Sequence, residues 1–333
     1  MTHARIWTPT GARVNPVGFG CMSIAGFYGP TNEAEALAVM ARALELGVNF
    51  WDTANVYGGG LSETLIGKFL AEDRRRREQI VLATKFAIRR APDGQRVIDN
   101  SEAHLLASLE GSLKRIGVDH IDLYYVHRLD KTIPIEVTVE VLARQVQAGK
   151  IGAIGLSEIS PDTLRRASAV HPIAAVQSEY SLWTRSPELG MIQACREVDA
   201  SFVAFSPVAR GAFSGKLRDI DALPADDFRK GTPRFSGVNW TRNLARIDAF
   251  VALASDWGWN PAALAIAWVI AQGEHIFTIP GTRYISHIEE NALAAKTPLT
   301  AVQVAAIERV LPVGFAAGDR YTEQQWGAIE RYA

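Results

Sequence analysis

The sequence predicts an α/β protein built as one (β/α)8 TIM barrel, a single domain spanning residues 1–333. Eight short apolar runs alternate with segments of helical pattern, which is typical of a parallel sheet covered by helices. No break in composition separates a second domain. The competing doubly wound sheet needs a G-x-G-x-x-G turn after its first strand, whereas the turn at 18–23 lacks the third glycine.

The first half of the chain contains four of the expected strands, at 17–21, 48–52, 80–84 and 121–126. A helix is expected over 31–46, with Thr31 as its N-cap and Gly47 beyond its end. Further helices are expected after Ser62-Glu63, over 101–115 and over 134–147.

The second half repeats the pattern with strands expected at 151–156, 173–176, 202–205 and 276–279. Ser160-Pro161 combines a capping residue with a proline at the first helical position, and Asn260-Pro261 does the same. Helices are also expected near 188–198 and over 241–257, and residues 286–289 have the capping-box pattern of a last barrel helix.

Two segments lie outside the repeat. The connection after strand seven, 206–240, is long enough to predict a lid or a ligand clamp. The tail from Pro298 onward contains a helix capped by Thr300 and then several aromatic residues. Two placements remain open for the tail, either over the barrel mouth or against the outside of the barrel.

Composition excludes several classes of function. The chain has 35 basic and 36 acidic residues and a net charge of -1, which favours neither nucleic acid nor an anionic membrane as a partner. The basic run 74–77 is flanked by acids and is interpreted as a solvated helix end. Cys21 and Cys195 form no disulfide framework and have no metal-ligand spacing. Neither a leader pattern nor an 18-residue apolar run is present, so a reducing, cytoplasmic location is expected.

Ionisable side chains end three adjacent strands. Asp52, Lys85 and His127 follow strands two, three and four, and Tyr57 lies in the loop after strand two. Each residue alone is compatible with a structural role, but active sites of this fold lie where these strand ends meet. Lys85 is expected to lower the Tyr57 pKa, Asp52 to keep Lys85 charged, and His127 to hold a carbonyl oxygen. No activated nucleophile accompanies this group, so hydride from a cofactor is the natural reactant.

Seven short motifs occur in order along the chain: DTANVYG, the ATK that ends at Lys85, IDLYYVHR, GKIGAIGLSEIS, VQSEYSLWTR, FSPVARG with SGK, and IPGTR with EEN. Together they resemble the motifs of the aldo-keto reductases, in particular the branch that includes pyridoxal and perakine reductases and bacterial relatives. The resemblance implies an oxidoreductase that interconverts carbonyls and alcohols, with Tyr57 as general acid beside Asp52, Lys85 and His127.

The resemblance also implies NADP(H) bound across the mouth, with NAD(H) left open. The implied contacts are Gly20, Met22, Asp52, Ser157, Glu158, Gln177, Phe205, Ser206, Pro207, Val208, Arg210, Lys216, Gly281, Thr282, Arg283, His287, Glu290 and Asn291. Within this set Ser157, Glu158 and Gln177 are assigned to the nicotinamide amide, and Arg210 and Lys216 to the pyrophosphate. His287 and Tyr284 stand where basic residues are frequent, which weakens the case for a 2′-phosphate.

Two alternatives accompany the reductase. One is a nucleotide-holding sensor like the potassium-channel β subunits, in which the position of His127 is typically Asn. The other is an aldolase with Lys85 as Schiff-base nucleophile, for which the lysine pKa must be depressed. The expected substrate is a small carbonyl or alcohol in an apolar slot with one cation, lined by Phe27, Tyr28, Phe86, Ile88, Arg128 and Trp183.

Overall fold

The computed structural model describes residues 4–7, 11–91 and 93–331, and a parallel sheet of eight strands lies at its centre. The strand order follows the chain, β12-β11-β10-β9-β8-β5-β4-β3, so that neighbours in sequence are neighbours in space. The predicted (β/α)8 barrel is confirmed. The strands are β3 (Phe19–Gly20), β4 (Phe50–Asp52), β5 (Val81–Phe86), β8 (Ile121–Val126), β9 (Ile151–Ser157), β10 (Ile173–Glu179), β11 (Ser201–Phe205) and β12 (Ile276–Thr278).

The first and last strands meet at a seam that closes the barrel. Parallel bridges join Val17 to Thr278 and Gly20 to Gly281. A Cβ atom on Gly20 would lie 2.6 Å from the carbonyl oxygen of Ile279, closer than real Cβ contacts come. Glycine is therefore required here because the two backbones approach each other directly.

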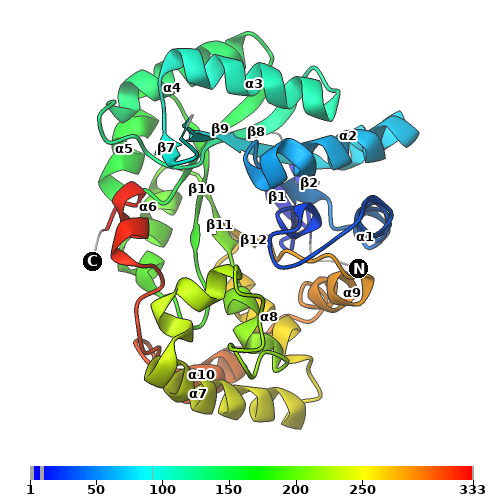
Figure 1. Ribbon diagram of the computed structural model, residues 1–333, viewed down its shortest axis with the longest axis vertical. Coiled ribbons are helices and arrows are strands. Elements are labelled where there is room, and N and C mark those ends of the chain that lie inside the picture. Colours follow the sequence, from blue (N-terminus) through cyan, green and yellow to red (C-terminus); the bar gives the residue numbers. More distant parts are fainter. Residues whose placement is uncertain (1–3, 8–10, 92, 332–333) are drawn as a thin grey trace.

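Helices surround the strands (Figure 1). They are α1 (Glu33–Glu45), α2 (Leu61–Glu72), α3 (Glu102–Ile116), α4 (Ile135–Gln147), α5 (Pro161–Val170), α6 (Met191–Glu197), α7 (Gly237–Asp256), α8 (Pro261–Ile270), α9 (Ile285–Leu293) and α10 (Ala301–Val310). The caps at Ser160, Asn260 and Thr300 are confirmed.

Two predicted helix starts are wrong. Asn32, not Thr31, caps α1, because the Asn32 side chain accepts a hydrogen bond from the Glu35 amide at 2.9 Å. Helix α9 begins at Ile285 after Tyr284 in extended conformation, without a side-chain cap, so the capping box expected at 286–289 does not form.

A hairpin that the sequence did not reveal plugs the amino-terminal end of the barrel. It consists of β1 (Arg5–Trp7) and β2 (Ala12–Val14). Trp7 is fully buried, and its ring lies 5.3 Å from Phe50 and 5.5 Å from Phe277 between centroids. Arg5 holds the hairpin by donating to the carbonyl of Ile270 at 2.8 Å. Large inward side chains thus fill the barrel below the mouth.

Three segments extend around the mouth. A second hairpin, β6 (Ile88–Arg90) with β7 (Arg96–Ile98), continues from the end of β5. The connection expected at 206–240 ends at 236, just before α7 begins, and contains short 3-10 turns. Its Phe228 ring lies 5.8 Å from Phe27 in the loop after β3. The tail, red in Figure 1, runs from α10 to the start of α5, where Glu330 accepts from the Ser160 amide at 2.7 Å. Of the two placements left open, the tail takes the one at the mouth, because Arg320 binds Glu158 at the end of β9.

The remaining expectations concern the surface and the thiols. Arginines of the run 74–77 pair with neighbouring acids: Arg75 with Asp73, Arg76 with Glu72 and Arg77 with Asp122. Cys21 and Cys195 are both free and buried. Within the described residues, every helix is too short or too polar to cross a membrane.

Candidate active site

The structure brings the four predicted catalytic side chains together. Asp52 is the last residue of β4, and Lys85 is the penultimate residue of β5. His127 follows β8, and these three strands are neighbours in the sheet. Tyr57 begins a 3-10 turn, Tyr57–Gly60, after β4. In that turn Gly58 and Gly59 adopt φ of 60° and 64°, a left-handed conformation that glycine favours.

Lys85 is the hub of the group. Its ammonium donates to the Asp52 carboxylate, to the carbonyl of Thr53 at 2.8 Å and to the Tyr57 hydroxyl at 3.5 Å. Gln177 donates to the other Asp52 oxygen at 2.8 Å. Lys85 is fully buried and Asp52 is 2% exposed, so the pair survives only because each charge is compensated.

The Lys85 ammonium and the Tyr57 hydroxyl both keep their protons. Burial lowers the pKa of Lys85, but Asp52 and the Tyr57 hydroxyl together raise it by more, so the net pKa lies above its ordinary value. Burial raises the pKa of Tyr57 more than Lys85 lowers it. The expected net lowering of the Tyr57 pKa is therefore wrong for the protein alone, and Tyr57 is a protonated phenol.

His127 is the fourth residue of the predicted catalytic group. Its ring packs edge-on against Tyr57 with 5.8 Å between centroids. Burial, followed by the charges of Arg128 and Lys85, holds the His127 pKa well below its ordinary value. The imidazole is thus neutral, and within the described chain its buried Nδ1 has no hydrogen-bond partner.

A second group of predicted residues gathers at the start of α9. The Lys216 ammonium lies 3.3 Å from Nε2 of His287. Burial and the nearby charges of Lys216 and Arg283 lower the His287 pKa, so its neutral ring accepts from the lysine. Among residues 4–7, 11–91 and 93–331, neither Lys216 nor Arg283 has an ion-pair partner. Close by in sequence, Thr282 and Asn291 are buried and Glu290 is half-buried.

The loop after β11 has an unusual backbone. Ser206, Ala209 and Arg210 adopt positive φ of 54°, 51° and 57°, which is costly for residues with a Cβ. Such conformations concentrate at ligand clamps, which supports the role expected for 206–210. Phe205 precedes this loop at the half-buried end of β11.

Two of the predicted cofactor contacts are occupied by protein partners. The Glu158 carboxylate binds Arg320 and accepts from the Glu179 amide at 2.9 Å. The Arg210 guanidinium, 5% exposed, pairs with Glu179 at 3.0 Å. The expected contacts of Glu158 with an amide and of Arg210 with a pyrophosphate are therefore not supported by this geometry, because a tail residue and a β10 residue neutralise them.

Sequence reasoning missed Glu179, Arg234 and Arg320, which form one buried ionic cluster with Glu158 and Arg210. Glu179 lies in the quoted EYSLWTR segment, so its unusual charge in a buried strand was a readable signal. Arg320 carried no such signal. It lies far along the chain and joins the cluster only through the path of the tail.

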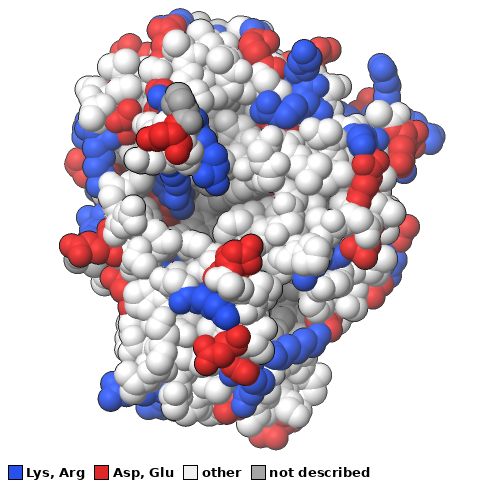
Figure 2. Space-filling view, in the orientation of Figure 1, with Lys and Arg blue, Asp and Glu red and all other residues white. Residues whose placement is uncertain are grey.

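The expected substrate slot is modified in two respects. Phe86 is fully buried and stacks on Tyr124 with 5.4 Å between centroids, so it belongs to the core outside the barrel. Arg128 is accompanied by a second cation, Arg96 on β7, whose charge acts on Arg128 and His127. Figure 2 shows a hollow at the centre of this face, with basic side chains along the edge where Figure 1 places β7.

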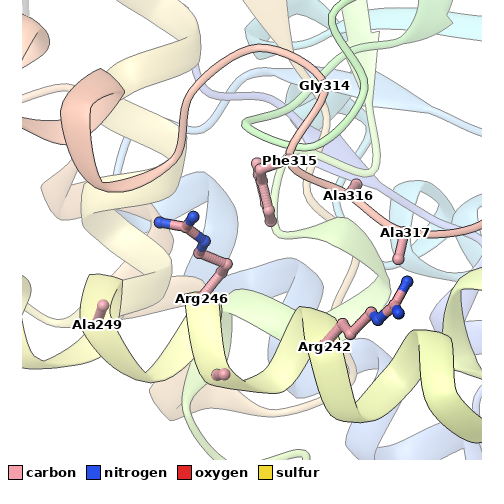
Figure 3. Close-up of a pocket in the computed structure, with 8 residues that line it drawn as sticks. Arg242, Arg246, Ala249, Gly314, Phe315, Ala316 and Ala317 are labelled. Carbon is pink, nitrogen blue, oxygen red and sulfur yellow. The ribbon is translucent and has the colours of Figure 1, made fainter.

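A separate cavity of about 720 Å³ lies between α7 and residues 314–317 (Figure 3). Arg242 and Arg246 of α7 and Phe315 of the tail line it. None of the predicted site residues contributes to its lining.

Comparisons with known proteins agree with the fold and with the motifs. The model of the aldo/keto reductase family matches residues 16–312. The chain is 40% identical over 312 residues to "Aldo-keto reductase yakc [NADP(+)]" of Schizosaccharomyces pombe, covering 92% of each chain. It is 42% identical over 328 residues to "Probable aldo-keto reductase 1" of Glycine max, covering 96% of this chain and 93% of the relative.

Solved structures of similar shape include glycerol dehydrogenase AKR11B4 from Gluconobacter oxydans. That likeness has a TM-score of 0.84 and 28% identity, and it covers 92% of this chain and 94% of the other. The holo form of aldo-keto reductase AKR11C1 from Bacillus halodurans matches with a TM-score of 0.77 and 29% identity, covering 97% and 99%.

Proposed function

The chain belongs to the aldo/keto reductase family, and on that basis we propose that it is an NADP(H)-dependent oxidoreductase that interconverts aldehydes or ketones and alcohols. The observation that carries the proposal is the contact of the fully buried Lys85 with both Asp52 and the Tyr57 hydroxyl, beside the unpartnered nitrogen of His127. The relative in Schizosaccharomyces pombe is named for NADP(+), which supports the choice of cofactor.

The residues at the mouth fit such a cofactor. Lys216 and Arg283 are cations without an acidic partner in the described chain, and they lie around His287 where an anionic phosphate would compensate their charge. Ser157 is the last residue of β9, and Gln177 on the neighbouring β10 donates to Asp52 at 2.8 Å.

When bound, the cofactor supplies the hydride, and the protein supplies the proton and the orientation. The neutral His127 donates a hydrogen bond to the carbonyl oxygen of the substrate and places it beside Tyr57. The Tyr57 hydroxyl then gives its proton to the oxygen as negative charge develops there. Lys85 stabilises the phenolate that remains, and Asp52 and Gln177 keep the lysine oriented.

This chemistry is favoured over the two alternatives. A Schiff-base lysine needs a depressed pKa, whereas Asp52 and Tyr57 raise that of Lys85 above its ordinary value. A sensor without turnover does not need a hydrogen-bond donor beside the tyrosine, and the chain has His127 at that place.

The free, buried thiols of Cys21 and Cys195 support a reducing, cytoplasmic compartment.

The decisive experiment is Tyr57→Phe. Loss of the general acid is expected to lower kcat about a hundredfold to ten-thousandfold. Binding of NADPH, followed by its fluorescence, should remain close to that of the parent. Tyr124→Phe is the matched control, because its hydroxyl is also buried but has no partner in the described structure and faces the outer core.

Turnover of a carbonyl panel at the parental rate by Tyr57→Phe would refute the mechanism. A parent protein that holds its nucleotide through many assay cycles without oxidising it would favour the sensor. Parallel titrations with NADPH and NADH test the expected preference for NADPH, to which Arg283 would contribute, since only NADPH carries the 2′-phosphate.

A further inference from the structure

Most arginines around the mouth are neutralised. Arg320 binds Glu158, Arg210 binds Glu179 at 3.0 Å, and Arg229 binds Asp227 at 2.7 Å. On the β6–β7 hairpin, Arg89 pairs with Asp99 at 2.9 Å. This pairing is the expected condition of charges removed from water. Any arginine left unpaired in this region therefore requires an explanation.

Arg128 is one such residue. It directly follows His127 and is only 9% exposed. Its Nη1 donates to the His127 carbonyl at 2.6 Å and to the Ser157 hydroxyl at 3.2 Å. No carboxylate of the described chain contacts it, and its Nε and Nη2 make no hydrogen bond with described atoms. One edge of a nearly buried guanidinium thus remains available beside the catalytic histidine.

Arg96 is the second. It lies on β7, opposite Arg90 in the hairpin register, and its side chain is exposed. No ion pair or hydrogen bond of its guanidinium is found within residues 4–7, 11–91 and 93–331. Burial and then the charge of Arg128 lower the pKa of Arg96, and the charge of Arg96 contributes to the lowered pKa of His127. Two like charges near each other at a hollow are unfavourable unless an anion lies between them.

We propose that the substrate carries an anionic group, a carboxylate or a phosphate, which Arg128 and Arg96 bind while its carbonyl lies between Tyr57 and His127. The guanidinium fork matches planar and tetrahedral oxyanions alike. The nearly buried Arg128 supplies the main contact and the exposed Arg96 adds attraction. This assignment rests on the proposed reductase function and names its substrate class.

The test compares pairs of aldehydes that differ in charge. One pair is 4-oxobutanoate and its methyl ester, and the other is glyceraldehyde 3-phosphate and glyceraldehyde, each assayed with NADPH. The parent is expected to prefer the anionic member of at least one pair by roughly tenfold or more in kcat/KM, the value of a charge-assisted hydrogen bond. The pair that shows the preference identifies the anion as carboxylate or phosphate.

Substitutions of Arg128 and Arg96 test which side chains cause the preference for the anionic aldehyde. Arg128→Met should reduce the preference for the anionic aldehyde over its neutral partner roughly tenfold to a hundredfold in kcat/KM, and Arg128→Lys should restore part of that preference. Arg96→Met should reduce the preference about threefold, because its charge is exposed to solvent. Arg309→Met removes an exposed arginine of α10 and should leave the preference intact.

Equal loss for both members of a pair in Arg128→Met would overturn the inference, because it would show that Arg128 only holds His127. So would a parent enzyme that reduces the neutral aldehydes but has no charge preference. Absence of turnover with all four aldehydes would refute the proposed reductase itself, and the inference with it.

Discussion

Arg320 is expected to fasten the tail to the barrel mouth, and its substitution by methionine gives a measurable cost. The Arg320 side chain is 9% exposed, and that of its partner Glu158 is 1% exposed. Without the guanidinium, Glu158 keeps the Glu179 amide at 2.9 Å as its hydrogen-bond donor, and no cation remains on it within the described chain. Glu179 itself keeps Arg210 at 3.0 Å.

Removing one member of a buried ion pair costs about 3–5 kcal/mol. We expect the lower end, about 3 kcal/mol of unfolding free energy in urea, because Glu179 remains paired. The alternative to leaving Glu158 buried and unpaired is release of the tail, which would expose residues 312–331 to protease. Limited proteolysis under native conditions therefore accompanies the unfolding measurement.

Two further variants test whether the unpaired Glu158 carboxylate causes the loss of stability. Adding Glu158→Gln to Arg320→Met removes the stranded charge and should recover at least half of the loss. Arg331→Met takes away an exposed arginine of the same tail and should have little effect. An Arg320→Met protein within about 0.5 kcal/mol of the parent, with its tail still protected, would show that the pair does not hold the tail.

Two further predictions concern the barrel plug and the histidine. Trp7→Ala should cost about 3–5 kcal/mol in urea unfolding, because the ring is fully buried between Phe50 and Phe277. Activity of the folded variant should persist, and a loss below about 1 kcal/mol would show that the hairpin is no plug. The His127 pKa is lower in the folded state than its unfolded value of about 6.5, so the stability it contributes is complete above that pH and is lost as the pH falls below it. The stability lost between pH 7.5 and pH 5 should therefore be smaller in His127→Asn than in the parent, and equal losses in both proteins would contradict this prediction.

Local sequence patterns were sufficient to predict the barrel and the proximity of the four residues of the proposed catalytic group. Apolar strands alternating with capped helices permit few topologies, and short connections make sequential strands neighbours. The residues after β4, β5 and β8 then meet at one end of the barrel by construction, whatever the details of packing. The contact of Lys85 with Asp52 and Tyr57 follows from that geometry alone.

The direction in which the Tyr57 pKa shifts did not follow from the sequence, because it depends on the balance of two opposing effects. A neighbouring ammonium lowers the pKa of a phenol and burial raises it, and only the structure shows that burial is the larger influence here. The same holds for Phe86, which is apolar like a slot residue but stacks on Tyr124 outside the barrel. The side of a strand on which a residue lies was not readable from its type.

What the sequence by itself determined is the fold, the family and the four residues of the proposed chemistry, because strand order and periodicity are local properties of the chain. The tertiary structure alone decided which charges are paired. Arg320 reaches Glu158 across 162 positions of sequence, and Arg210 reaches Glu179 in place of an expected ligand. Ion pairs between distant segments depend on the paths of loops and the tail, for which the chain has no periodic pattern. Only the tertiary structure, likewise, shows that Arg128 and Arg96 have no acidic partner among the described residues.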